Sequence, residues 1–222
     1  MPGYILHLTA AQMLLAKRDN HINRNDFLMG NLLPDTVRNK AVSHFRNPKH
    51  FGERIEYPDL DLFMAKYRHL LYDDSCLGYY YHLYIDRQFF REYLRNVVTF
   101  LDVDGKEERK IERVAWAYIH KTGVSVPIEQ FFSEAYYYGD FTKMNSYLVE
   151  RYQIPLELSL DVGNPGIEEV DYQDVLHVLK ELEGYLDVPS EAVRELKVFD
   201  LDDLLAFLQN AAEDWTKILK RK

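Results

Sequence analysis

The most constraining feature of this sequence is an apolar stretch that carries two ionisable side chains in its middle. Residues 77–94 read LGYYYHLYIDRQFFREYL, a pattern typical of a helix that is buried on nearly all sides. His82 and Asp86 stand four residues apart, so a helix places both on one face with β-carbons about 6 Å apart. A buried aspartate is costly unless it is paired, usually with a metal ion or an arginine. The stretch therefore predicts either a metal site or a structural ion pair of Asp86 with Arg87 or Arg91.

The rest of the chain predicts an all-α fold, a multi-helix bundle. Glycine and proline are sparse, with 10 and 8 copies in 222 residues, and most long segments repeat apolar residues at helical spacing. We find no convincing strand pattern, and the polar run 36–58 is expected to form mostly an ordered loop. The expected helices are about 4–17, DLDLFMAKYRHLLYD, the opening stretch up to about Leu101, ERKIERVAWAYIHK ending at Gly123, and a helix from near Pro127 to about Tyr152.

The chain is expected to divide at a segment rich in proline and glycine. Residues 153–170, QIPLELSLDVGNPGIEEV, contain two of each and predict a linker or loop between a helical domain, 1–152, and a C-terminal helical extension, 171–222. The extension contains three further helical segments with acidic starts, which suit the helix dipole. We expect this extension to pack on the same domain.

Composition excludes several classes of protein. Cys76 is the single cysteine, so an intramolecular disulfide or a thiolate metal cluster cannot form, and histidine and carboxylate must supply any metal site. The net charge is −9 and the single basic run is the terminal KILKRK, so no nucleic-acid partner is expected. No transmembrane segment or signal peptide is expected either, which favours a cytoplasmic location. The sequence leaves the oligomeric state open, and an oligomer is compatible with it.

A second pair of metal-ligand types lies upstream of the apolar stretch. The segment MGNLLPDTVRNKAVSHF places Asp35 directly after a bend before Pro34 and His44 nine residues later, on irregular backbone that can adapt to a ligand. Together with His82 and Asp86 they make a set of two histidines and two carboxylates. Zinc, manganese and iron all accept this mixture of ligands.

Other histidines and the tyrosine runs allow two interpretations each. His7 lies on the apolar first helix, where a lone histidine is more often a hydrogen-bonded core residue than a ligand. His50 is on the same loop as His44 and is its one rival. The runs at 79–81 and 136–138 are either part of a substrate groove or, as we favour, core packing.

Three segments in order carry a resemblance to a known family. HLTAAQMLL, DFLMGNLLPDTVRNKAVSHF and YYYHLYIDRQFF, within about residues 1–95, resemble the zinc-dependent phospholipase C family, whose relatives include nucleases of the S1/P1 type. The resemblance implies an all-helical fold with up to three metal ions. It implies that Asp35, His44, His82 and Asp86 hold one zinc ion, and that Asp86 bridges to a second ion bound also by His7.

The chain departs from the family pattern in two places. Secreted members also use the mature N-terminal amine and carbonyl for the second metal, whereas no leader is expected here and His7 lies closer to the start. The family has a histidine six residues beyond the bridging aspartate, and this position is Glu92, which is either a ligand or, as we favour, an exposed charge. We therefore expect one or two zinc ions, with manganese or iron as alternatives.

The resemblance implies a metal-dependent hydrolase, a phosphoesterase of the phospholipase C type. Asp35 or Asp86 would orient or deprotonate the attacking water, and the substrate would be a small-molecule phosphoester or a phospholipid. The alternative is a metal-stabilised, non-catalytic helical scaffold that binds a partner. A third hypothesis is a structural pair of His82 and Asp86 without any metal.

Overall fold

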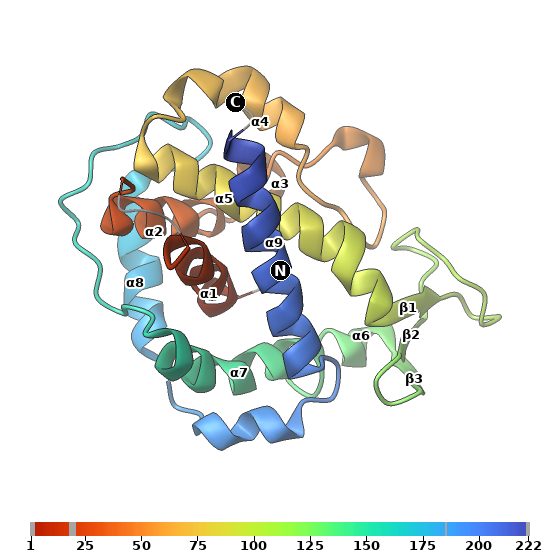
Figure 1. Cartoon of the computed structure of the whole chain (residues 1–222). Coiled ribbons are helices and arrows are strands. Elements are labelled where there is room, and N and C mark those ends of the chain that lie inside the picture. The colour runs from red at the N-terminus through yellow and green to blue at the C-terminus, as the bar shows by residue number, and fades with distance from the viewer. Residues whose placement is uncertain (1–2, 18–20, 185, 221–222) are drawn as a thin grey trace.

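The chain folds mainly into helices, and the computed structural model describes residues 3–17, 21–184 and 186–220. The α-helices are α1 (Tyr4–Leu15), α2 (Arg24–Leu32), α3 (Lys40–Ser43), α4 (Leu60–Tyr67), α5 (Asp74–Gln88), α6 (Ile128–Phe131), α7 (Tyr137–Tyr152), α8 (Val175–Gly184) and α9 (Leu201–Lys220). The strands are β1 (Val98–Leu101), β2 (Trp116–Ile119) and β3 (Val124–Pro127). Short 3-10 helices cover Leu33–Asp35, Pro48–His50, Arg68–Leu70, Leu94–Asn96, Tyr172–Asp174 and Ser190–Glu195, and a π-helical turn covers Phe89–Tyr93. In Figure 1, α5 runs through the middle of the helices, and the small sheet lies beyond its C-terminal end.

Two glycines allow α2 and α5 to cross with their backbones in contact. A β-carbon added at Gly30 would lie 1.8 Å from the carbonyl oxygen of Ser75 on α5. A β-carbon at Gly78 would lie 2.0 Å from the carbonyl oxygen of Phe27 on α2. No larger side chain fits at either position. The crossing places the C-terminal end of α2 beside the middle of α5.

The aromatic side chains of α5 form the platform on which α9 packs. Trp215 of α9 is fully buried, and its ring centre lies 4.9, 5.3 and 4.8 Å from those of Tyr80, Tyr81 and Tyr84. Tyr79 is also fully buried. Core packing, the interpretation that we favoured for the run 79–81, is therefore confirmed. Among the described residues, no helix combines the length and the apolar character that crossing a membrane requires.

A buried carboxylate ties the C-terminal segment to α7. Asp140 is fully buried and accepts backbone N–H groups from Lys197, Val198 and Phe199 at 2.7–3.1 Å. Such bonds compensate the cost of burying the charge. The segment 153–170 contains no helix or strand, in keeping with the predicted loop.

The expectation of an all-α fold without strands is wrong over residues 98–127. These form a three-stranded antiparallel sheet in the order β1-β2-β3, and the helix expected over ERKIERVAWAYIHK is replaced by β2. Exposed and buried residues alternate along β2, with Ala117 and Ile119 on the buried side, which is the period of a strand. Gly123 has φ +68° and forms the turn into β3, where we had expected it to end a helix.

Two predicted helices are shorter than expected. The opening stretch is α-helical only as far as Gln88, and it continues through the π-helical turn into β1. The helix expected from Pro127 is interrupted between α6 and α7. The Ser133 hydroxyl donates to the carbonyl of Gln130 and accepts the N–H of Ala135, so it competes with the helical pattern there.

The backbone contact between α2 and α5 predicts that Gly78→Ala will be strongly destabilising. The added methyl group meets main-chain atoms that cannot rotate away, so we expect a loss of about 3 kcal/mol in the free energy of unfolding. Chemical denaturation of the purified variant would measure it. Gly163→Ala is the matched control, because a β-carbon there meets no atom within 4 Å. Equal stability of the two variants would contradict the proposed crossing.

Candidate metal centre

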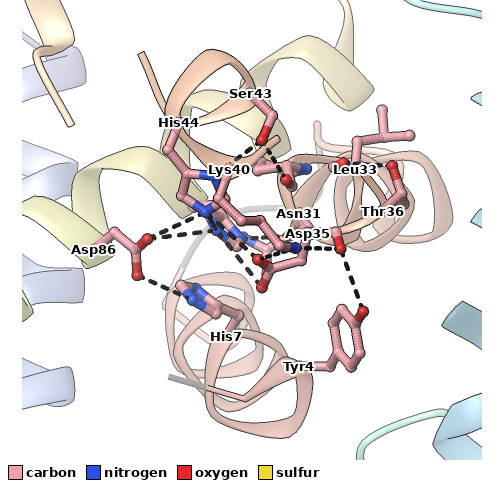
Figure 2. A network of polar contacts seen from close by, with 12 residues as sticks. Tyr4, His7, Asn31, Leu33, Asp35, Thr36, Lys40, Ser43, His44 and Asp86 are labelled. Carbon is pink, nitrogen blue, oxygen red and sulfur yellow. Dashed lines mark hydrogen bonds and ion pairs between the residues drawn. The ribbon is translucent and has the colours of Figure 1, made fainter. Parts of the chain in front are cut away.

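Five side chains from four segments converge on one buried point. His7 comes from α1, Asp35 from the 3-10 turn after α2, His44 from the end of α3, and His82 and Asp86 from α5 (Figure 2). Asp35 is 6% exposed and the other four are at most 1% exposed. The structure thus brings together all five residues that the sequence analysis singled out as metal ligands.

The ligand atoms form two overlapping groups, His44, His82 and Asp86, and His7, Asp35 and His82, each with its atoms close enough to share one metal ion. His44 Nε2 lies 3.5 Å from Asp35 Oδ1, 3.3 Å from Asp86 Oδ2 and 3.2 Å from His82 Nε2. His82 Nε2 lies 4.0 Å from Asp35 Oδ2 and 3.8 Å from Asp86 Oδ2. Ligand atoms bound at about 2.0–2.2 Å in a tetrahedron are roughly 3.3–3.6 Å apart. The measured separations bracket that range.

His7 approaches Asp86 from the other side. Its Nε2 lies 3.2 Å from Asp86 Oδ1, the oxygen that does not face His44 and His82. The His7 ring is stacked on that of His82 with centres 3.7 Å apart. Asp86 therefore contacts His44 and His82 through Oδ2 and His7 through Oδ1.

Hydrogen bonds behind the histidines fix which ring nitrogen faces the cluster. His82 Nδ1 lies 2.8 Å from the carbonyl oxygen of Asn31, so it must be the protonated nitrogen. The Ser43 hydroxyl donates to the carbonyl of Pro34, so His44 Nδ1, at 3.0 Å, donates to that hydroxyl. Both Nε2 atoms are then lone-pair donors aimed at each other. This is how metal-binding histidines are held in most known sites.

The backbone next to His44 adopts an uncommon conformation. Phe45 has φ +49°, the left-handed region that bulky residues rarely occupy. Its ring packs edge-on against those of Phe63 and Tyr79, with ring centres 5.2 and 6.3 Å apart. The Tyr79 hydroxyl also donates to the carbonyl of Ser43 at 2.5 Å. Aromatic packing thus holds the turn that points His44 inward.

Burial and neighbouring charges give His82, Asp35 and Asp86 the protonation states of metal ligands. Burial, and then His7, lower the pKa of His82 to about 3, so this imidazole is neutral near pH 7. Burial raises the pKa of the two carboxyls, but the surrounding histidines, with Lys40 beside Asp35, outweigh it. The pKa of Asp35 lies well below its usual value and that of Asp86 is about 2. Neutral imidazole and ionised carboxylate are the forms that bind metal.

The cluster has acceptors in excess of donors, which is the condition that a divalent cation relieves. Both oxygens of Asp86 and both nitrogens of His7 are buried without an aligned hydrogen bond. Orphaned buried polar groups of this kind are costly in a protein interior. The ligand types and their spacing fit a divalent ion such as zinc.

The alternative in which an arginine pairs with Asp86 is wrong. Arg91 contacts Glu92, with 3.2 Å between Nε and Oε1, and among the described residues no arginine lies within 4.0 Å of the Asp86 carboxylate. Glu92 is an exposed charge, as we favoured. The side chains that lie within 4.0 Å of the Asp86 carboxylate in ion pairs are His7, His44 and His82.

Other histidines lie outside the cluster. His50, the rival of His44, is at the surface, where Glu53 lies 3.1 Å from its Nδ1 and Tyr57 3.3 Å from its Nε2. His177 and Glu181 on α8 are 79% and 41% exposed and contact each other at 3.2 Å, so they add nothing to the buried cluster.

Sequence reasoning missed the residues that support the five ligands. Asn31 and Ser43 orient two imidazoles, but Asn31 acts through its backbone carbonyl, which no side-chain motif reveals. Lys40 was missed as well. Its ammonium donates to Asp35 Oδ1 at 2.8 Å and to the Asp35 carbonyl, and the Tyr4 hydroxyl donates to the same carbonyl at 3.3 Å. Lys40 is 28% exposed and forms the solvent-facing edge of the site.

Comparisons with models of protein families, with curated proteins and with solved structures found no match to this chain. The geometry of the cluster indicates a bound metal ion, because nitrogen and oxygen lone pairs converge in a buried space.

The ion pair between Lys40 and Asp35 predicts that Lys40→Met will bind divalent metal more tightly than the wild type. The ammonium competes with a metal ion for Asp35, so its removal should lower the dissociation constant for zinc by about tenfold. Isothermal titration of the metal-stripped protein would measure it. Lys49→Met is the control, since Lys49 is an exposed cation on the same loop without contact to the cluster. Equal affinity in all three proteins would show that Lys40 does not compete.

Proposed function

We propose that this protein is a divalent-metal-dependent hydrolase that cleaves a phosphoester, with zinc as the ion that its ligands fit best. The observation that supports this most is that the two carboxylate oxygens of Asp86 contact different histidines, Oδ2 with His44 and His82 and Oδ1 with His7. This is the arrangement expected when one carboxylate serves two neighbouring ions. A bound divalent ion lowers the pKa of water toward neutrality and polarises a phosphoryl oxygen.

Asp35 is better placed than Asp86 to act on water. Asp86 is 1% exposed and is enclosed by three histidines, whereas Asp35 lies at the edge that Lys40 shares with solvent. In this proposal Asp35 accepts the proton of the attacking water at a carboxylate oxygen. Asp86 then holds the imidazoles at fixed spacing. This narrows the two candidates for the base to one.

Lys40 is the cation available to a substrate at this edge. Its ammonium is partly exposed and contacts the cluster only through Asp35. When Asp35 contacts the metal ion or the attacking water, the ammonium is free to bind a non-bridging phosphate oxygen as a point charge. The net charge of −9 disfavours anionic membrane surfaces, which supports a small soluble phosphoester over bulk phospholipid.

The role of Asp35 predicts that Asp35→Asn will lose about 100-fold or more in kcat/KM for a phosphodiester. The amide keeps the size of the side chain and cannot accept the proton. Hydrolysis of bis(p-nitrophenyl) phosphate, and of p-nitrophenyl phosphate as a monoester, by zinc- or manganese-loaded protein would measure it. Asp161→Asn, an exposed aspartate outside the site, is the control. Unchanged hydrolysis in Asp35→Asn would contradict its role as the base.

The depth of the cluster favours a second candidate, a metal-stabilised scaffold without catalysis. Structural sites are coordinatively closed, and four of the five residues here are at most 1% exposed. In this case the metal stabilises the fold by mass action, by about 4 kcal/mol when free metal is a thousandfold above its dissociation constant. Thermal unfolding with and without a chelator would show that loss. Fast hydrolysis by the loaded protein would exclude this candidate.

A further inference from the structure

A cavity lies apart from the His/Asp cluster, at the junction of the sheet with the loop before α4. Its volume is about 260 Å³, and it is lined by residues of four segments, 50–57, 90–95, 98–100 and 107–109. In Figure 1 the segment between α3 and α4, in orange-brown on the right-hand side, reaches down toward the strands. None of the five cluster residues lines it.

The cavity is lined by an arginine that has no counter-ion. The guanidinium carbon of Arg54 lies over the Phe132 ring, 4.1 Å from its centre. Its Nε is buried without a hydrogen-bond partner, and among the described residues no carboxylate lies within 4.0 Å of its guanidinium. The side chain as a whole is half-buried, and an arginine that is partly removed from water is usually paired. Arg54 is therefore a candidate to bind an anion.

The more distant ionisable groups do not form an ion pair with Arg54. Burial lowers the pKa of Arg54, and Tyr138 and Glu129 oppose this only through electrostatic attraction at a distance. Arginine nevertheless stays charged in proteins. A ligand with a planar or tetrahedral anionic group would form the charge-assisted hydrogen bonds that a guanidinium prefers.

Two of the three glutamates that line the cavity are already engaged. Glu53 pairs with His50, with 3.1 Å between Oε1 and Nδ1. Glu108 accepts the backbone N–H groups of Arg109 and Lys110 through Oε1 at 2.7 and 2.9 Å. Glu107 is exposed at the rim. These carboxylates therefore do not neutralise Arg54.

The opposite wall of the cavity is apolar. Phe90, Leu94 and Phe100 line it, and Phe100 and Leu94 are almost fully buried. A wall of this kind accommodates an aromatic or short aliphatic body by removing it from water. The volume is below that of typical drug-sized sites, which selects a small molecule over a lipid with long chains.

We propose that this cavity is a binding site for a small organic anion, whose phosphate or carboxylate group pairs with Arg54 and whose apolar body lies against Phe90 and Phe100. Arg95 and Arg109, also on the lining, add positive charge at the entrance. The site does not depend on the proposed hydrolase activity, because none of its residues belongs to the His/Asp cluster.

The test is a titration of the full-length, 15N-labelled protein with phenyl phosphate, followed by amide chemical shifts. We expect saturable shifts at residues of the cavity lining, and at least tenfold weaker binding in Arg54→Met. Methionine keeps the apolar stem over Phe132, so the fold should survive. Arg68→Met, which removes an exposed arginine outside the cavity, is the control for lost charge and should bind as the wild type does.

Further probes separate the parts of the proposal. Benzoate should bind if any anionic group suffices, and only phenyl phosphate if a phosphate is required. Phenol and inorganic phosphate should each bind at least tenfold more weakly, since each lacks one half of the ligand. Equal binding of phenol, or unchanged binding in Arg54→Met, would overturn the proposal. Phenyl phosphate binding that is abolished by a chelator and insensitive to Arg54→Met would assign the probe to the His/Asp cluster, and would leave the proposed function standing.

Discussion

The contact between α2 and α5 is the constraint on which the rest of the structure depends. Because Gly30 and Gly78 carry no side chains, the two backbones touch, and the end of α2 lies directly beside the middle of α5. Two consequences follow from this one crossing. The carbonyl of Asn31 reaches His82 Nδ1, and the turn that follows α2 delivers Asp35 to the face of α5 that carries His82 and Asp86. A helix pair held further apart would separate these ligands.

The electrostatics of the cluster explain why a cation belongs there. Two lone-pair nitrogens lie 3.2 Å apart with carboxylate oxygens around them, and the hydrogen bonds to Asn31 and Ser43 keep the protons on the far side of both rings. In an apolar interior this concentration of acceptors is unfavourable unless positive charge is shared among them. Lys40 supplies such charge only at the outer edge, to Asp35. The centre of the cluster still lacks a positive charge. Both the catalytic and the scaffold proposals place a metal ion there to supply that charge.

Sequence reasoning succeeded where local spacing sets the geometry and failed where long-range contacts do. His82 and Asp86 are one helical turn apart, so their shared face follows from the helix alone. Asp35 and His44 could be grouped with that pair by their ligand types and by the family resemblance, but their return to that face could not be derived from spacing, because it depends on two glycines and a left-handed Phe45. The sheet was missed for two reasons. Ala117 occupies a buried strand position beside Ile119, although alanine is depleted in strands and favoured in helices. Gly123 forms a turn between strands, and a glycine at the end of a helix would look the same in the sequence. The role of Asn31 could not have been found, since it acts through its backbone.

The most direct test of the central claim is the anomalous diffraction of crystals grown with zinc or manganese. The account predicts an ion bonded at about 2.0–2.2 Å to His44 Nε2 and His82 Nε2 and to the carboxylates of Asp35 and Asp86, with any second ion between Asp86 and His7. A crystal that takes up metal elsewhere on the protein while the two Nε2 atoms share a proton or a water molecule would contradict it. In that case the cluster is a buried polar network, and α5 carries His82 and Asp86 only for the stability of the fold.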